Sequence, residues 1–235
     1  MEGAKMVTDY HIVSISGGMA SAVAADIVIN KYGLHNVTLW FADSRWEDDD
    51  TYRFLDDCLQ RWHCDSVICR DGRTPPEVWA DCKIIPNSLI APCNRVLKIV
   101  PFRKFVSRYF LKPVTVHLGF DWQDTHRLDA PRRHYEALSG VIVNYPLLEL
   151  APFDLTARIE SWGISPPRMY KLGFPHNNCG GRCPKQGKRE WRRLKTNFPD
   201  RFDEMAEWEQ WARSQSETRA TKTFLKNISL KDLSL

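Results

Sequence analysis

The chain has 235 residues and a formal net charge of +4; 43% of its residues are hydrophobic and 26% are charged. This composition is typical of a globular protein and excludes disordered, collagen-like and coiled-coil proteins as descriptions of the whole chain. No segment approaches the roughly 20 consecutive apolar residues that a membrane span needs, and residues 1–9 carry charges and lack the apolar core of a signal peptide. We therefore expect a cytoplasmic protein without a membrane partner.

Apolar segments alternate with helix-like segments through the first 150 residues. Prolines punctuate residues 70–94, which we expect to be irregular. The alternation predicts an α/β fold, a parallel five-stranded doubly wound sheet covered by helices on both faces. The predicted strands are residues 10–15, 37–42, 66–69, 114–120 and 141–145, and the predicted helices are residues 21–32, 48–62, 96–110 and 128–138.

The pattern changes after Pro146, where the strand-like segments end. Helices are predicted over residues 156–162, 185–195 and 200–213. We therefore divide the chain into an α/β domain, residues 1–150, and a helical, basic C-terminal lobe, residues 151–235, which contains a cysteine motif.

A glycine-containing loop joins the first predicted strand to the first predicted helix. Glycines let the backbone approach an anion closely, and a helix N-terminus supplies N–H donors and the positive end of a dipole. The loop lacks the Gly-Lys-Ser/Thr ending of a Walker loop. The alternative is a plain strand-to-helix turn. The predicted phosphate-binding residues are Ser16, Gly17, Gly18, Met19, Ala20 and Ser21.

This Ser-Gly-Gly-x-x-Ser segment resembles the PP-loop of the ATP pyrophosphatase superfamily, whose fold is adenine nucleotide alpha hydrolase-like. The usual PP-loop reads Ser-Gly-Gly-x-Asp-Ser, and Ala20 stands in place of the aspartate. Later segments resemble the phosphoadenosine-phosphosulfate (PAPS) reductase-like branch, in the small form that occurs in phages and bacteria. These segments are residues 92–101, 119–127, 145–149 and 173–183.

The resemblance implies an enzyme that binds ATP with Mg²⁺ and adenylates a substrate, with release of pyrophosphate, for sulfur transfer or a related modification. The implied partners are a nucleic acid acceptor (DNA or tRNA), a sulfur donor such as a cysteine desulfurase, and a second copy of the chain in a homodimer. One alternative is a PAPS reductase, although no cysteine follows Cys183 where those enzymes carry a C-terminal nucleophile. Another alternative is a non-catalytic nucleotide-binding module.

Several charged and small residues lie where the resemblance places the nucleotide. Asp43 and Gly119 follow predicted strands and are expected to border it. Asp121 is the candidate Mg²⁺ ligand, and Lys98 and Arg127 are candidate catalytic cations for a phosphate group. The acidic residues 47–50 are interpreted instead as a helix first turn that favours the dipole.

A basic run follows the cysteine motif. Trp191 lies within it, and the run could follow a polynucleotide backbone while the tryptophan stacks on a base. The alternative is a solvated helix face. The cations of the run are Arg182, Lys185, Lys188, Arg189, Arg192, Arg193 and Lys195.

The seven cysteines do not suggest a disulfide framework, because the number is odd and the chain is not a small secreted scaffold. Cys93, Cys179 and Cys183 are predicted to converge on one metal centre. A [4Fe–4S] cluster, zinc with His176 as a fourth ligand, and unligated structural thiols all remain open. The other cysteines are interpreted as packing residues; they are Cys58, Cys64, Cys69 and Cys82.

Overall fold

The computed structural model describes residues 10–109, 113–215 and 223–234. The predictions for residues 1–9 and for the end of the helix at Phe110 lie outside these ranges. The chain divides into two compact units that interleave along the sequence, whereas the sequence pattern predicts a single boundary at residue 150. The first, the sheet unit, comprises Met1–Ala42, Tyr52–Cys69 and Pro101–Pro166. The second, the cysteine unit, comprises Asp43–Thr51, Arg70–Val100 and Pro167–Leu235.

The sheet unit is built on one five-stranded, fully parallel sheet with the order β3-β2-β1-β4-β5. The predicted fold class and all five strands are thereby confirmed. The chain leaves β1 toward β2 on one side and later returns to β4 on the other side, so the strand order switches at β1. The crevice at such a switch is where open parallel sheets bind ligands. The strands are β1 (Tyr10–Ile15), β2 (Val37–Ala42), β3 (Val67–Cys69), β4 (Val114–Leu118) and β5 (Val141–Asn144).

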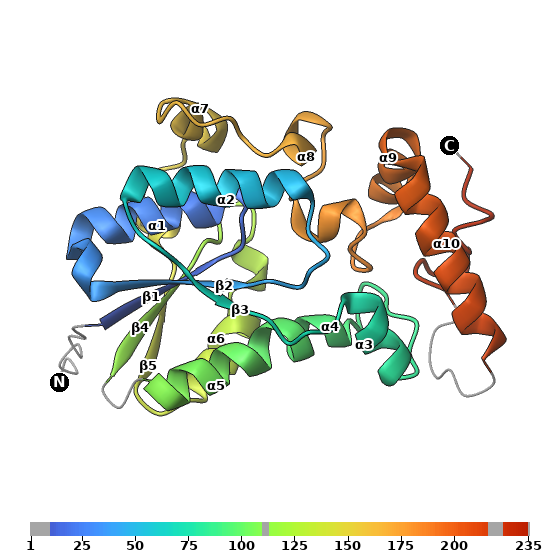
Figure 1. Ribbon diagram of the computed structural model, residues 1–235, viewed down its shortest axis with the longest axis horizontal. Helices are drawn as coiled ribbons and strands as arrows, with labels where there is room; N and C mark the ends of the chain where they lie inside the picture. The colour runs from blue at the N-terminus through green and yellow to red at the C-terminus, as the bar shows by residue number, and fades with distance from the viewer. Residues whose placement is uncertain (1–9, 110–112, 216–222, 235) are drawn as a thin grey trace. The chain divides into compact units, whose positions relative to one another are not determined.

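Helices cover both faces of this sheet. Figure 1 shows α1 and α2 on one face and α5 and α6 on the other. Trp40 of β2 packs edge-on against Phe102 of α5, with ring centroids 4.9 Å apart, and Tyr135 of α6 joins the same core. The helices are α1 (Met19–Tyr32), α2 (Asp49–Trp62), α5 (Val100–Tyr109), α6 (Asp129–Glu136) and α7 (Leu155–Glu160), with short 3₁₀ turns η1 (Leu34–Asn36), η3 (Thr125–Arg127) and η4 (Pro146–Glu149).

The cysteine unit is helical and has a separate aromatic core, in which Trp79, Trp191 and Phe224 pack together. A π-helical turn, η2, continues α4 and leads directly into α5. Helices α9 and α10 pack against each other. The helical elements are α3 (Pro75–Asp81), α4 (Pro92–Asn94), η2 (Arg95–Ile99), α8 (Arg168–Lys171), η5 (Asn178–Gly181), α9 (Lys188–Asn197) and α10 (Pro199–Ser214).

Helices α3 and α4 lie in the segment that the prolines led us to predict as irregular, and that prediction is wrong for residues 75–81 and 92–94. Thr74 and Glu77 form a capping box, in which the Thr74 backbone N–H donates to Glu77 at 2.6 Å. Pro75 occupies the first helical position, where its missing N–H costs nothing. The prolines therefore begin this helix instead of breaking it.

Within the described ranges, no helix is long and apolar enough to cross a membrane.

Candidate functional site

The loop after β1 combines a left-handed glycine with a helix N-terminus. Gly17 has φ 72°, a conformation that side chains disfavour, and Gly18 is the N-cap of α1. Because Gly18 has no side chain, the first N–H groups of α1 are not capped from this position, and they point the positive end of the helix dipole into the loop. The predicted residues of this phosphate loop, residues 16–21, therefore form an anion-binding arrangement.

Ser21 holds the phosphate loop closed. Its hydroxyl accepts the Ser16 backbone N–H at 3.0 Å and lies 3.1 Å from the Ser16 hydroxyl. It donates in turn to the Gly18 carbonyl at 2.9 Å. The Ser21 side chain is thus used within the loop, which leaves backbone N–H groups as the principal donors to a ligand.

Gly119, immediately after β4, packs directly against this loop. A Cβ at Gly119 would lie 2.4 Å from Ser21 Cα and 2.8 Å from the Ala20 carbonyl carbon. Only a glycine lets the end of β4 approach the first turn of α1 this closely. The structure therefore brings Gly119 to the loop at the switch point of the sheet, as a residue that shapes the loop.

Asp121 and Arg127, the other predicted residues of the sheet unit, are engaged locally. One Asp121 oxygen accepts the Gln123 backbone N–H at 2.8 Å. Arg127 is exposed, pairs with Asp124 at 3.2 Å and stacks over the Phe120 ring at 5.4 Å. Their assigned roles with Mg²⁺ and phosphate stay predictions.

The cysteine motif forms a left-handed turn, residues 179–183, which we call the cysteine turn. Cys179, Gly180 and Gly181 have φ values of 56°, 54° and 81°. A Cβ on Gly181 would lie 2.8 Å from Met169 Cε, so this position is crowded as well as left-handed. The Arg182 N–H closes the turn on the Cys179 carbonyl at 3.0 Å.

The turn brings two thiols close enough to shift each other's pKa. Side-chain hydrogen bonding by Cys179 is the main cause that lowers the pKa of Cys183 to about 7. Burial opposes this shift, and the Lys185 backbone N–H and the Lys98 charge reinforce it. The same hydrogen bond, together with burial and Glu47, raises the pKa of Cys179 well above its ordinary value. Cys183 is therefore the more acidic thiol of the two.

Lys98 projects its charge toward this pair from the π-helical turn η2. Its ammonium lies 3.5 Å from a Glu47 oxygen, and the other Glu47 oxygen accepts the Cys179 backbone N–H. Burial lowers the pKa of Lys98, but Glu47 and the cysteines outweigh it and raise the pKa above its ordinary value. Lys98 thus stays charged beside the thiols, and π-helical turns of this kind often occur at functional sites.

The segment before α2 wraps the cysteine turn. Asp48, completely buried, accepts Arg168 Nε and Arg201 Nη1 at 2.7 Å each. Arg201 also donates to the Gly180 carbonyl at 3.1 Å, and Arg182 donates to the Trp46 carbonyl at 3.2 Å. These bonds tie the cysteine turn to residues more than a hundred positions away in the sequence.

The interpretation of residues 47–50 as a helix first turn is wrong for two of the four. Helix α2 starts at Asp49, whereas Glu47 and Asp48 precede it and are buried. Burial raises the pKa of Asp48, but hydrogen bonds from Arg168 and Arg201 outweigh it and lower the pKa below its ordinary value. A run of four acids was visible in the sequence, but its partners were not.

Cys93, the third predicted cysteine, belongs to the same neighbourhood. It interacts electrostatically with Cys183 and with Lys98, and burial raises its pKa. However, no three or more His, Cys, Asp or Glu side chains in the part of the chain that the structure describes are grouped to hold a metal ion. The cluster and zinc interpretations therefore stay predictions.

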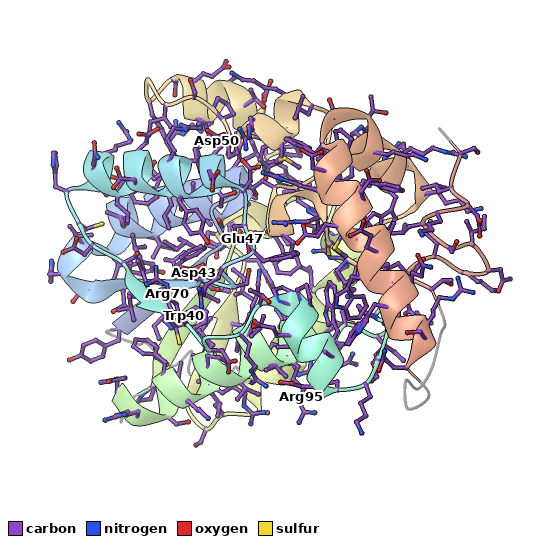
Figure 2. The ribbon with its side chains drawn as sticks, turned by 45° about the vertical axis from the view of Figure 1, so that its right-hand side comes forward. Trp40, Asp43, Glu47, Asp50, Arg70 and Arg95 are labelled. Carbon is purple, nitrogen blue, oxygen red and sulfur yellow. The ribbon has the colours of Figure 1, made fainter. Side chains whose placement is uncertain are left out.

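Asp43 directly follows β2 and is almost fully buried. Its carboxylate accepts the Arg45 backbone N–H at 2.8 Å and the Arg70 Nε at 2.7 Å, and Figure 2 shows Asp43 and Arg70 facing each other. The pair ties the segment that follows β2 to the segment that follows β3. The expected role of Asp43 beside an adenosine stays a prediction.

The basic run does not offer the predicted stacking residue. Trp191 is completely buried in the core of the cysteine unit, so its interpretation as a base-stacking side chain is wrong. Arg192 and Lys195 donate to the carbonyls of Ser234 and Leu233, both at 2.9 Å. Part of the run therefore fastens the C-terminal segment to α9.

All seven cysteines lie in described ranges and are free thiols. Cys58 is buried, and burial raises its pKa to about 12. Cys64 and Cys69 are half-buried, but Cys82 is exposed, so the interpretation of Cys82 as a packing residue is wrong.

Comparison with known proteins places these features in a family. Residues 10–179 match the phosphoadenosine phosphosulfate reductase domain. The chain belongs to the phosphoadenosine phosphosulfate reductase family. The match begins at β1 and extends to Cys179, so it spans both the phosphate loop and the first cysteine of the turn.

A solved structure has the same fold. The phosphoadenylyl-sulfate (PAPS) reductase from Candida auris, in a phosphate complex, superposes with a TM-score of 0.50 at 15% sequence identity. The comparison covers 72% of this chain and 80% of that one. A comparison with curated protein sequences gives no match.

Proposed function

We propose that this chain is a sulfonucleotide reductase: it binds PAPS, or adenosine phosphosulfate, at the phosphate loop and releases sulfite. The observation that carries the proposal is the loop, in which the left-handed Gly17 turns the chain into the N-terminus of α1, whose first backbone N–H groups can bind an anion. The family match supplies the class of nucleotide.

The reaction needs two thiols. A thiolate attacks the sulfonate sulfur, a sulfur–sulfur bond forms, and the bond from that sulfur to the phosphate oxygen breaks, so that the nucleotide leaves with the electron pair. A second thiolate then attacks the first thiol sulfur, a disulfide forms, and sulfite leaves. The dithiol loses two electrons and the sulfonate sulfur gains them. The N-terminus of α1 stabilises the negative charge that develops on the leaving phosphate.

Adenylation with ATP, the main interpretation from the sequence, has weaker support. It would use the same loop, but Ala20 places a methyl group where the superfamily usually has a carboxylate. We therefore favour a reaction in which the loop binds a sulfonucleotide that is already formed, so that no adenylation step is needed.

The test compares the two reactions directly. The purified chain is supplied with ³⁵S-labelled PAPS or adenosine phosphosulfate and dithiothreitol, and sulfite is measured; in parallel it is supplied with ATP and Mg²⁺, and pyrophosphate is measured. We expect sulfite release, and we expect loss of both sulfite release and nucleotide binding in the double variant Gly17→Val/Gly18→Val.

The matched control is Gly163→Val, which also has a positive φ, 77°, but has open space around it. It should retain nucleotide binding. Release of pyrophosphate from ATP without any sulfonucleotide turnover would reject the proposal in favour of adenylation. Unchanged nucleotide affinity in the folded double variant would reject the phosphate loop as the site.

A further inference from the structure

Two histidines are buried in the sheet unit, and the proposed reaction uses neither of them. His11 of β1 and His117 of β4 are 5% and 0% exposed. Nδ1 of His11 lies 3.0 Å from Nε2 of His117, which is hydrogen-bond distance. Buried polar groups are costly unless each of them is satisfied, so the protonation state of this pair affects the stability of the fold around it.

Asn144 of β5 determines where the protons of the pair lie. Its side-chain oxygen accepts the Tyr145 backbone N–H at 2.7 Å, so its amide nitrogen faces His117 Nδ1, at 3.4 Å. An amide N–H donates, and His117 Nδ1 therefore accepts and carries no proton. The proton of the neutral His117 ring then lies on Nε2 and is donated to His11 Nδ1. Both imidazoles are satisfied when they are neutral.

One additional proton breaks this arrangement on either ring. On His117 Nδ1 it would place an N–H against the Asn144 amide N–H, and on His11 Nδ1 it would place an N–H against the His117 N–H. Lys31, at the end of α1, adds positive charge nearby and pairs with Glu149 at 3.7 Å. Burial, His11 and Lys31 together lower the pKa of His117 to about 3.

The pair also contacts the end of helix α1. Tyr32, the last residue of α1, stacks on His11 with ring centroids 3.6 Å apart and ring planes 21° from parallel. Its ring centroid lies 5.9 Å from that of His117. The phosphate loop connects β1 to α1, so the stack joins these two elements at the ends that lie farthest from the loop along the chain.

We infer that His11 and His117 form an acid-sensitive latch: the pair holds the end of α1 on the sheet while both imidazoles are neutral, and uptake of one proton opens it. Opening frees α1 from β1, the two elements that the phosphate loop connects, so acid reduces the fraction of the chain that can bind an anion. This last consequence rests on the proposed function of the loop, whereas the latch itself does not.

The direction of the pH effect follows from the two pKa values. A histidine without these contacts has an ordinary pKa of 6.5, and the pKa of His117 is lowered in the closed protein. The closed form is therefore fully stable above pH 6.5 and loses stability as the pH falls below 6.5 toward the lowered pKa, because only the open form takes up the proton. Uptake of one proton makes the opening constant rise about tenfold per pH unit in this range.

The experiment measures amide hydrogen exchange in the full chain between about pH 5 and pH 7.5, with each rate corrected for its intrinsic pH dependence. The reporters are the amides of Tyr32 and Gly33; the Gly33 N–H donates to the Ile29 carbonyl at 2.9 Å at the end of α1. In the parent we expect their protection to fall about tenfold per pH unit below 6.5.

Variants separate the latch from other titrating groups. In His11→Phe/His117→Leu, the phenyl ring can still stack on Tyr32 but neither side chain takes up a proton, so protection should be nearly independent of pH. His134→Gln is the matched control, because it removes an exposed histidine of the same unit, and it should keep the parental slope. A parental slope no steeper than that of the double variant would overturn the latch.

A second measurement uses the parent alone, in case the double variant does not fold. Nitrogen-15 spectra of the imidazole rings at about pH 5 should show a neutral His117 with its proton on Nε2. A charged His117 ring in the folded protein, or a neutral ring with its proton on Nδ1, would overturn the inference.

Sulfate tests the link between the latch and the phosphate loop, because its charge does not change over this pH range. If only the closed form binds sulfate, a concentration of about ten times its dissociation constant should raise the protection of the two amides about tenfold at low pH. Gly17→Val/Gly18→Val should abolish this increase. Unchanged protection with sulfate bound, as measured by calorimetry, would overturn the link. Absence of sulfate binding would reject the loop as an anion site and the link with it, whereas the slope measured without sulfate decides the latch separately.

Discussion

The phosphate loop and the cysteine turn are both short, glycine-rich segments that lead toward a helix, but they are held in different ways. The loop is stabilised by its own residues, through the Ser21 hydroxyl, and by one close backbone contact at Gly119. The turn is stabilised by charged side chains from other segments, namely the buried Glu47 and Asp48 and the half-buried Arg201.

This difference follows from the chemical group that each site offers: backbone N–H groups in the loop and a thiol in the turn. A backbone loop offers N–H groups, whose partial charges need no counter-ion and depend only on the local conformation. A thiolate is a full charge, and its pKa depends on hydrogen bonds and cations that must be brought in by the fold. We therefore expect the turn to be sensitive to distant substitutions and the loop to be sensitive to nearby ones.

The largest expected effect is at Asp48. Its ion pairs with Arg168 and Arg201, which we call the clamp, lie beside the cysteine turn. Asp48→Asn removes the charge that pairs with Arg168 and Arg201 and leaves two arginines without their carboxylate. Because a hydrogen bond to a charged group contributes about 1.5–3 kcal/mol and the two arginines are partly exposed to solvent, we expect a loss of about 2 kcal/mol of unfolding free energy. Urea denaturation of the variant should show this loss.

The matched control is Asp81→Asn, which removes an exposed ion pair with Arg73. Exposed pairs contribute little to stability, so the control should be close to the parent. Equal stabilities of the Asp48 and Asp81 variants would contradict the clamp.

The same carboxylate gives the clamp a pH dependence. The pKa of Asp48 is lowered in the folded protein, because the bonds from Arg168 and Arg201 outweigh its burial. Its contribution to stability is therefore fully present above its ordinary value of 3.8 and is lost as the pH falls through the lowered pKa. The stability difference between the parent and Asp48→Asn should shrink over this acidic range.

The second-largest effect is expected at Gly119, which packs directly against the phosphate loop. Gly119→Ala adds a Cβ 2.4 Å from Ser21 Cα, and the backbone of the loop must move. Overpacking of this kind costs about 1–3 kcal/mol. Calorimetry with adenosine 3′,5′-bisphosphate should show weaker binding as well. Gly163→Ala is the control, because its positive φ is strained but its surroundings are open, so it should lose stability without losing affinity.

The sequence predicts the sheet unit well because its signals are local. Strands β1 and β2 have the predicted boundaries, and the glycines after β1 mark the phosphate loop without knowledge of any partner. The close packing of Gly119 was not visible, because it depends on β4 lying beside β1. Helix α3 was missed although Thr74, Pro75 and Glu77 carry its start signals, since the prolines were interpreted as helix breakers.

The cysteine unit was predicted less well because its determinants are distant in sequence. The spacing of Cys179 and Cys183 marked the turn, but Glu47 and Asp48 were assigned to a helix dipole. Arg201 carries no motif at all, and only the fold brings it to Gly180. Trp191 appeared in a basic run, yet the apolar side of an amphipathic helix buries it.

A third, smaller effect is expected on the pKa of the Cys183 thiol in the cysteine turn. The rate of its alkylation by iodoacetamide should rise with a midpoint near pH 7, whereas Cys64, whose pKa is raised by burial, should react only at higher pH. Cys179→Ala removes the donor that is the main cause of the lowering and should move the midpoint toward the ordinary value of 9.0.

Lys98→Met should move the same midpoint upward by less, because the Lys98 charge is a smaller cause of the lowered pKa than Cys179. The groups that set the midpoint are Cys179, Lys98, Lys185 and, through Cys179, Glu47. An unchanged midpoint in both variants would mean that the turn does not tune Cys183.

The smallest effect is expected at Ser21, within the loop itself. Ser21→Ala removes the hydroxyl that accepts the Ser16 N–H and donates to the Gly18 carbonyl, while the helix N-terminus and Gly17 remain in place. Loss of a typical hydrogen bond costs about 1 kcal/mol, so the variant should unfold at slightly lower urea concentration. If backbone N–H groups bind the anion, affinity for adenosine 3′,5′-bisphosphate should fall only severalfold, far less than in Gly17→Val/Gly18→Val. Complete loss of binding in a folded Ser21→Ala protein would show instead that the hydroxyl contacts the ligand and that the loop, like the turn, works through a side chain.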